Sequence, residues 1–368
     1  MISVFGCLVE GEEIDAVQKT LESQWLGLGK CVTNFENGYK NKFGLTHFSM
    51  VDSGSNALYL ALKAMNLPFN SEVIVPSYTW VACAQAVILN GLRPVFCDVD
   101  LKTMNVTIDT VKQKITDTTS AIMVVHYAGL AVDMDPIIEL GLPIIEDCAH
   151  CAGSTYKGKP VGELGEVGIY SFDAVKNLTA GEGGGVASKH KNIMKNVLQA
   201  RYCGIGKSGF EASMKQAGNT DKWWEYNIGA ASPKCLPNNI TASIANAQLQ
   251  KIDELQERRK AIWNFYNEQF KNSNVLTPVN AQNGDVHSYF TYCIRVKSRD
   301  ELANYLLSNK IYTTLRYHPL HLNAVYGQTD ITLRNSEELN STALSIPLHP
   351  RLSDDEVELV ADLILSFQ

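Results

Sequence analysis

Strand and helix signals alternate along the first 150 residues, and this order constrains the fold more than any other feature. Short apolar runs predict strands, and segments with helical periodicity separate them. The predicted strands are 72–76, 94–98, 121–126 and 143–146, and the predicted helices are 12–23, 32–43, 53–65, 80–89, 108–115 and 135–140. Strands joined through helices pair in the same direction, so we predict an α/β fold with a mostly parallel central sheet flanked by helices.

The remainder of the chain predicts a second, smaller unit. A basic and aromatic stretch at 202–234 indicates a long loop, and loops of that length are usually functional. After it come a long predicted helix at 240–268, predicted strands at 289–296 and 311–317, and predicted helices at 299–308 and 354–365. A chain of 368 residues is long enough to form two hydrophobic cores. We predict a large domain at 12–250 and a small α/β domain at 251–368, with residues 1–11 packing on the latter.

Two residues next to predicted strands suggest pyridoxal phosphate (PLP) chemistry. Lys176 stands alone between an apolar strand that ends near Ser171 and the glycine cluster 181–185. Upstream, Asp147 follows another apolar strand. A lysine amine can form a Schiff base with the PLP aldehyde, and a carboxylate can keep the pyridine nitrogen protonated. Ligands collect at the carboxyl ends of parallel strands, so we expect both residues in one site.

The start of the predicted helix 53–65 offers a phosphate site. Its first residues are Ser53, Gly54, Ser55 and Asn56. Backbone N–H groups and the helix dipole at such a terminus favour an anion. An ordinary helix cap is the alternative, but the nearby strand-end aspartate favours phosphate binding.

Several motifs extend this pattern along nearly the whole chain. They are Gln24-Trp-Leu-Gly-Leu-Gly29, Asp52-Ser-Gly-Ser-Asn-Ala57, Val73-Ile-Val-Pro-Ser-Tyr-Thr-Trp80, Val125-His-Tyr-Ala-Gly129, Glu146-Asp-Cys-Ala-His150, Ser171-Phe-x-x-x-Lys176, Gly181-Glu-Gly-Gly184, Tyr317-His-Pro-Leu-His321 and Ile346-Pro-Leu-His-Pro350. In this order they resemble the DegT/DnrJ/EryC1/StrS family of PLP-dependent aminotransferases of nucleotide-linked keto-sugars. The resemblance implies a fold-type-I aminotransferase.

The resemblance also implies roles for individual residues. Gly54, Ser55, Asn56 and Ser171 would hold the PLP phosphate, Trp80 would lie against the ring, and Asp147, His150 and Lys176 would be the catalytic residues. A core tryptophan and a structural histidine are the alternatives for Trp80 and His150. The sugar pocket would be lined by Tyr127, Glu182, Tyr317 and His318, although Glu182 could simply shape its turn.

One segment departs from the family pattern. Where many members carry Asn-Tyr-Arg-Met, which reaches the partner's cofactor phosphate across a dimer interface, this chain reads Lys234-Cys-Leu-Pro237. Lys234 could still supply a cation, but as a point charge without the arginine fork. We expect a homodimer with shared active sites.

The resemblance predicts transfer of an amino group from glutamate to a keto carbon of a nucleotide-linked deoxysugar. Such products feed surface polysaccharides, other glycans or natural products. One alternative is a PLP-dependent sugar dehydratase, which carries histidine in place of the lysine. Another is a non-catalytic PLP-binding regulator, which would be expected to lose Lys176, Asp147 or the phosphate cradle.

Composition excludes other classes of function. The net charge of −7 is spread along the chain, and no basic stripe suggests a nucleic-acid partner. Nine cysteines include one C-x-x-C, at Cys148 and Cys151, without the second pair of a zinc site, so we expect no metal. Free thiols fit a cytoplasmic location. The N-terminus lacks the basic region of a signal peptide, and no apolar run approaches the length of a membrane span.

Overall fold

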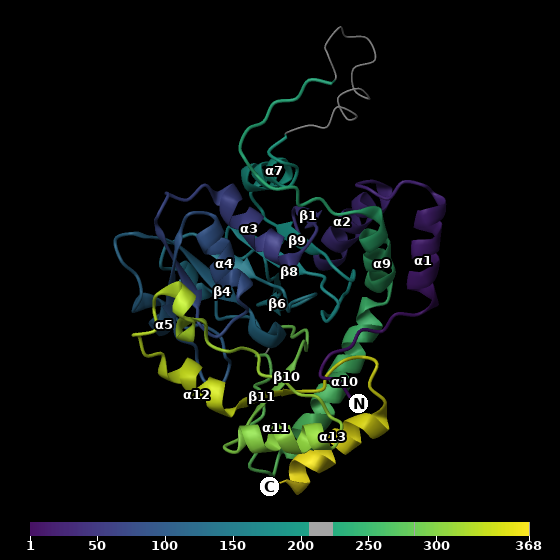
Figure 1. Ribbon diagram of the computed structural model, residues 1–368, viewed down its shortest axis with the longest axis vertical. Helices are drawn as coiled ribbons and strands as arrows, with labels where there is room; N and C mark the ends of the chain where they lie inside the picture. Colours follow the sequence, from purple (N-terminus) through teal and green to yellow (C-terminus); the bar gives the residue numbers. More distant parts are fainter. Residues whose placement is uncertain (206–223, 283, 368) are drawn as a thin grey trace.

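The computed structural model describes residues 1–205, 224–282 and 284–367, in a larger body built on a central sheet and a smaller body beside it (Figure 1). Much of the loop predicted at 202–234 lies outside these described residues. Its two described ends run antiparallel, with bridges from Tyr202 to Lys234 and from Ile205 to Ile228. Among the described helices, none is long and apolar enough to cross a membrane.

The central sheet has seven strands in the order β1-β9-β8-β5-β4-β2-β3. Their bounds are β1 Phe48–Val51, β2 Glu72–Pro76, β3 Arg93–Cys97, β4 Thr119–Val125, β5 Ile144–Asp147, β8 Val167–Ser171 and β9 Gly184–Ala187. Only β9 is antiparallel to its neighbours, β1 and β8. The prediction of a mostly parallel sheet is therefore confirmed.

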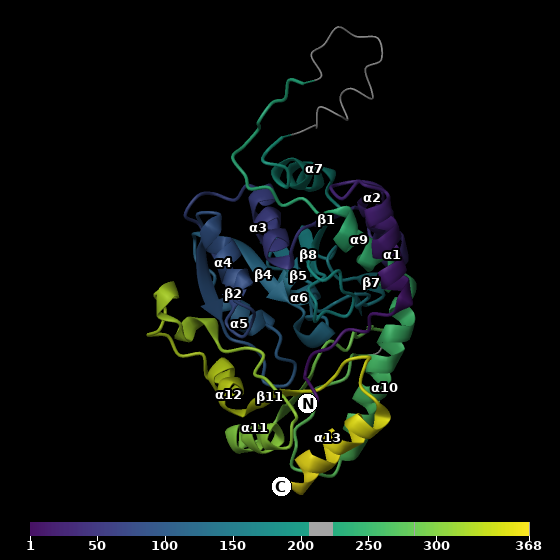
Figure 2. The same cartoon turned by 45° about the vertical axis from the view of Figure 1, so that its right-hand side comes forward.

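Apolar side chains alternate between the two faces of this sheet, and each face carries its own core. In β2, Ile74 joins a core that includes Phe35 of α2 and Ala245 of α9. Val73 and Val75 join the opposite core, which is built on α3, α4 and α7. The two helical layers enclose the sheet (Figure 2). The helices of this body are α1 Gly11–Glu22, α2 Lys30–Phe43, α3 Gly54–Met65, α4 Ala82–Leu89, α5 Ile108–Lys112, α6 Asp135–Ile138, α7 Lys191–Ala200 and α9 Asn239–Gln250. Short elements complete it, namely η1 Tyr127–Gly129, β6 Thr155–Tyr156 and β7 Lys159–Pro160.

The smaller body has a third core around Trp263, Tyr292 and Ile346. Its elements are α10 Ile252–Phe270, β10 Tyr292–Arg295, α11 Arg299–Ser308, α12 Arg334–Thr342, β11 Ala343–Ile346 and α13 Asp354–Ser366. The short helices η2 Leu320–Leu322 and η3 Ala324–Tyr326 lie between α11 and α12 in sequence, but Leu320 and Tyr326 pack on the core of the larger body. Strands β10 and β11 pair antiparallel. Ile2 packs against this core and bridges to Ile311, so the first residues of the chain reach the smaller body.

Two details of the sequence prediction were wrong. The single helix predicted at 240–268 is broken at Lys251, whose φ of −105° and ψ of 13° leave the helical region. The Lys251 ammonium lies 3.1 Å from Glu10 and 3.0 Å from Glu13, which fixes the break beside α1. The strand predicted at 311–317 is reduced to isolated bridges at Ile311 and Thr314. The domain boundary between residues 250 and 251 stays a prediction.

Candidate active site

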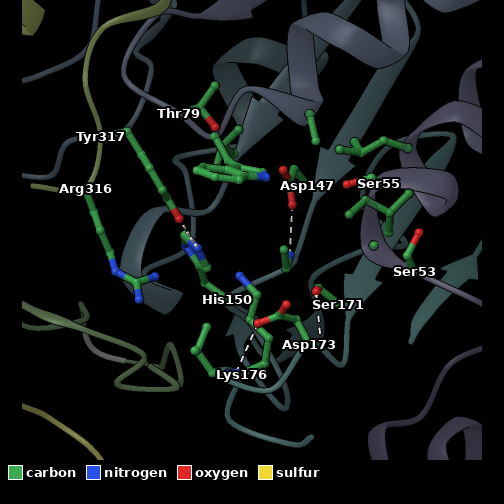
Figure 3. A pocket seen from close by; sticks show the side chains of 18 of the residues that line it. Ser53, Ser55, Thr79, Asp147, His150, Ser171, Asp173, Lys176, Arg316 and Tyr317 are labelled. Carbon is green, nitrogen blue, oxygen red and sulfur yellow. Dashed lines mark hydrogen bonds between the residues drawn. The ribbon is translucent and has the colours of Figure 1, made fainter. Parts of the chain in front are cut away.

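A cavity of about 350 Å³ lies at the carboxyl ends of the central strands (Figure 3). Side chains from both bodies meet there. The walls include Phe5, Ser53, Gly54, Ser55, Thr79, Trp80, Asp147, His150, Ser171, Asp173, Lys176, Glu182, Arg316 and Tyr317. Parallel strands end at one edge of a sheet, so residues distant in sequence converge at this edge.

The N-terminus of α3 forms one wall, and its geometry suits a phosphate. Ser53 caps the helix, and its hydroxyl accepts a hydrogen bond from the Asn56 backbone N–H at 3.2 Å. A side chain at Gly54 would place its Cβ 2.8 Å from the Ser171 side chain, so only glycine leaves this space open. Backbone N–H groups at the start of a helix favour an anion. The Asn56 side chain does not line the cavity and donates to Asp52 at 2.8 Å instead.

Asp147 ends β5 and is held from two sides. It is only 5% exposed. One oxygen, Oδ1, accepts from the Ala149 backbone N–H at 2.9 Å. The other, Oδ2, accepts from the Cys83 thiol at 3.1 Å. These bonds fix the carboxylate at the cavity wall, where a protonated pyridine nitrogen could meet it.

Lys176 lies in the loop after β8 and lines the cavity near Asp173 and His150 (Figure 3). Its Nζ lies 4.6 Å from the centre of the Phe290 ring. Burial, followed by the nearby Arg316 charge, lowers the pKa of Lys176 to about 8. A large fraction of the amine is therefore neutral at weakly alkaline pH, as a nucleophile requires.

His150 is fixed in one orientation. Its ring stacks on Phe290 with centroids 4.1 Å apart. The backbone N–H of Ala128 donates to its Nδ1 at 3.3 Å, so Nε2 carries the proton and faces the Tyr317 hydroxyl at 3.0 Å. Burial lowers the pKa of His150 well below its usual value, and the ring is neutral at pH 7.

The cavity brings together most, but not all, of the residues predicted for the site. Trp80 lines it with 56% of its surface exposed, which rejects the alternative of a core tryptophan. Glu182 lines it too, and burial raises the pKa of its carboxyl group. Besides Asn56, three more predicted residues lie elsewhere. Tyr127 is buried, and its hydroxyl donates to the Arg316 carbonyl at 2.5 Å. His318 is exposed and bonds Asn340. Lys234 is exposed and forms a backbone bridge with Tyr202.

The structure adds residues that sequence reasoning missed. Cys83, Phe290 and Arg316 surround the predicted catalytic residues. Arg316 had a usable signal, because a lone arginine inside a predicted strand, directly before a family-like motif, is unusual. Cys83 and Phe290 had none, since thiols and aromatic rings on apolar segments are ordinary core residues.

A possible metal cluster lies outside this cavity. His126, Glu146 and Cys148 are buried close enough together to hold an ion. Their polar atoms already have protein partners. His126 bonds Glu146 at 3.0 Å, and the two Glu146 oxygens accept from the backbone of Gly162 and Gly165. We interpret the group as a structural network.

Comparison with known proteins assigns the chain to a family. The sequence profile of the DegT/DnrJ/EryC1/StrS aminotransferase family matches residues 8–365. The chain belongs to this family. The family's enzymes depend on PLP, so this protein is a PLP-dependent transaminase.

Individual relatives of this DegT/DnrJ/EryC1/StrS protein cover almost its full length. The dTDP-4-dehydro-2,3,6-trideoxy-D-glucose 4-aminotransferase of Saccharopolyspora spinosa is 33% identical, over 98% of this chain and 95% of its own. The crystal structure of the aminotransferase TlmJ from Streptoalloteichus hindustanus superimposes with a TM-score of 0.92 at 32% identity, covering 100% of this chain and 98% of the other. The PLP form of Spr1654 from Streptococcus pneumoniae gives a TM-score of 0.89 at 26% identity, covering 98% and 97%.

The cavity fits PLP. The open space at Gly54 suits the phosphate, Asp147 suits the ring nitrogen, and Lys176 offers a nucleophilic amine. Asp147 is supported by a side chain on α4, Cys83, which in turn contacts a side chain just before that helix. Thr79 contacts the Cys83 sulfur at 3.4 Å. Burial, and then the Asp147 carboxylate, raise the pKa of the Cys83 thiol, so it stays protonated and donates.

We expect Cys83→Ala to lower kcat/KM by about tenfold, because one hydrogen bond to a charged group is lost. Cys83→Ser should stay within about threefold of the parent, because a hydroxyl still donates. Steady-state kinetics check both. Cys97→Ala is the control, since it removes a buried thiol that does not line the cavity. A serine variant as impaired as the alanine variant would show that packing, and not the hydrogen bond, matters at this position.

Proposed function

We propose that this protein transfers an amino group from glutamate to the keto carbon of a nucleotide-linked deoxysugar. The observation that carries the proposal is the pairing of a lone, partly neutral lysine with an anchored aspartate in one cavity. The sugar substrate is inferred from the dTDP-sugar aminotransferase that is 33% identical to this chain. Products of this kind supply polysaccharide, glycan or natural-product synthesis.

Five side chains that line the cavity have defined tasks in this reaction. Bound PLP supplies an electron sink for the carbon that exchanges its amino group. Asp147 holds the ring nitrogen protonated, and the N-terminus of α3 with Ser171 holds the phosphate. The Lys176 amine moves a proton between substrate and cofactor, and its pKa of about 8 suits a group that must both accept and donate near neutral pH. Neutral His150 donates from Nε2, and Trp80 offers an exposed face for the ring.

Lys176 argues against the dehydratase alternative, in which histidine takes its place. The regulatory alternative would not need Lys176, Asp147 and the α3 terminus together, and all three line the cavity. Of the residues predicted for the sugar, Glu182 and Tyr317 line the cavity and remain proposed sugar contacts. Tyr127 acts indirectly, because its hydroxyl donates to the Arg316 carbonyl.

A direct test mixes the PLP-loaded protein with glutamate and a panel of UDP-, dTDP- and GDP-linked keto-sugars. Mass spectrometry should find a product in which an amine replaces the keto oxygen. The visible absorption of the protein should bleach with glutamate and return with the keto-sugar. Loss of water from the sugar without amination would indicate the dehydratase instead.

We further propose that the working unit is a cytoplasmic homodimer with shared sites. The described residues 224–234 run away from the main body (Figure 1), and they expose Tyr226 at 59% and Ile228 at 64%. Apolar groups presented in this way favour a protein partner. Lys234 is exposed and outside its own cavity, so it is free to reach the partner's phosphate site. Sedimentation equilibrium tests the dimer, and a monomer at micromolar concentration would reject it.

A further inference from the structure

Arg316 is a buried cation that has no counterion among the described residues. Its side chain lines the cavity and is only 7% exposed. Among the described residues, no carboxylate lies within ion-pair distance of it, and its Nε has no hydrogen-bond partner. Burying an unpaired charge is costly. An anion is therefore expected to complete this site when substrate is bound.

The guanidinium is held rigidly at the cavity wall. Its Cζ lies 4.4 Å from the centre of the Phe5 ring and 4.6 Å from that of Phe290. The Arg316 carbonyl accepts from the Tyr127 hydroxyl, which fixes the backbone behind it. The N-terminal segment and both bodies thus converge on one side chain. A guanidinium held in a fixed plane is suited to form two parallel hydrogen bonds with a carboxylate.

A second buried arginine strengthens the positive field. Arg259 is 1% exposed, and its Nη1 donates to the Phe290 and Leu348 carbonyls, at 3.3 Å and 3.1 Å. Burial, and then the Arg316 charge, lower the pKa of Arg259 to about 9. Two guanidinium groups near Phe290 without a described carboxylate favour an anionic ligand.

The position of Arg316 separates it from the phosphate wall. In Figure 3 it lies across the cavity from Ser53, Ser55 and Ser171, with His150 and Lys176 between. The cofactor phosphate therefore has its own site. The Lys176 amine and the Arg316 guanidinium both lie 4.6 Å from the centre of one ring, that of Phe290. A ligand that fits here has a negative charge close to the carbon that reacts next to Lys176. An amino acid has this arrangement, because its α-carboxylate is attached to the carbon that bears its amino group.

We propose that Arg316 binds the α-carboxylate of the amino donor and thereby selects amino acids as donors. This inference rests on the proposed aminotransferase function. The two half-reactions use one cavity in turn. The sugar substrate carries its negative charge on the diphosphate at the anomeric carbon, not on the keto carbon that must approach Lys176, whereas the α-carboxylate of an amino acid is one bond from its reacting carbon. Arg316 therefore acts mainly on the donor half of the reaction.

The test measures each half-reaction alone by stopped-flow absorption of the PLP-loaded protein. We expect Arg316→Gln to lower kcat/KM for glutamate by at least about 30-fold. Alanine, tested as a poorer donor, should lose the same factor, because it has the same α-carboxylate. The half-reaction that starts from the amino-sugar product should change by less than about threefold. Arg316→Lys keeps the charge without the fork, so its loss should be intermediate.

Binding of glutarate, a dicarboxylate without an amine, gives a readout independent of turnover. Titration calorimetry should show weaker binding to Arg316→Gln than to the parent. Arg258→Gln is the matched control, since this arginine pairs with Asp354 outside the cavity and should leave both measurements unchanged.

Three results would overturn the proposal. They are a loss for glutamate but not for alanine, equal losses in both half-reactions, and unchanged glutarate binding in both Arg316 variants. Failure of the proposed function looks different. In that case the parent protein aminates no keto-sugar in the panel, while its glutamate half-reaction still depends on Arg316.

Discussion

Replacing Lys176 by alanine is expected to abolish turnover. No other described lysine lines the cavity, so no amine remains to attach PLP or to move the proton. Loss of a catalytic group of this kind lowers the rate by roughly 10⁴-fold or more. Steady-state kinetics with glutamate and the active keto-sugar measure the loss. The variant should bind PLP only noncovalently, without the visible absorption of the parent protein.

Chemical labelling provides the control for this prediction. Borohydride reduction of the parent protein, followed by peptide mapping, should place the cofactor on Lys176. Lys191→Ala changes an exposed lysine on α7 and should keep full activity. Label on any other lysine would disprove the assignment of Lys176.

Asp147→Asn is expected to lower kcat by roughly 10²–10³-fold, the size seen when one key electrostatic partner of a reaction is removed. The amide has nearly the shape of the carboxylate but no charge, so it cannot keep the pyridine nitrogen protonated. The fold should change little, because the amide can still accept at Oδ1 from the Ala149 backbone N–H. Kinetics and thermal melting measure the two effects separately.

Asp253→Asn serves as the comparison, since it removes an exposed carboxylate that pairs with Lys42. Its activity should match that of the parent. If Asp147→Asn also kept nearly full activity, another residue would have to meet the ring nitrogen, and the assignment of Asp147 would fail.

The sequence predicted the catalytic pair because both residues follow apolar strands. The run that ends at Asp147 and the run before Ser171 form β5 and β8, which are neighbours in the sheet. Parallel strands end at a common edge, so local patterns were enough to place Asp147 and Lys176 in one cavity. The order of strands and helices likewise predicted the α/β fold.

Local patterns were insufficient where a contact between distant segments decides the conformation. The helix at 240–268 has continuous helical periodicity, yet it breaks at Lys251, because that residue bonds Glu10 and Glu13 more than 230 positions away. The strand at 311–317 has an apolar pattern, but only Ile311 and Thr314 find strand partners there. Tertiary packing overrides propensity in both places.

The sequence by itself determined the fold class, the lysine and aspartate, and the open helix terminus at Gly54. These features depend on short-range periodicity and on residue types whose chemistry leaves few alternatives. Only the tertiary structure showed that the Cys83 thiol supports Asp147 and that Arg316 is a buried cation near Lys176, with no carboxylate partner in the part of the chain that the structure describes. The physical reason is that these properties arise from burial and from neighbours far away in the chain. Neither is encoded within a short stretch of sequence.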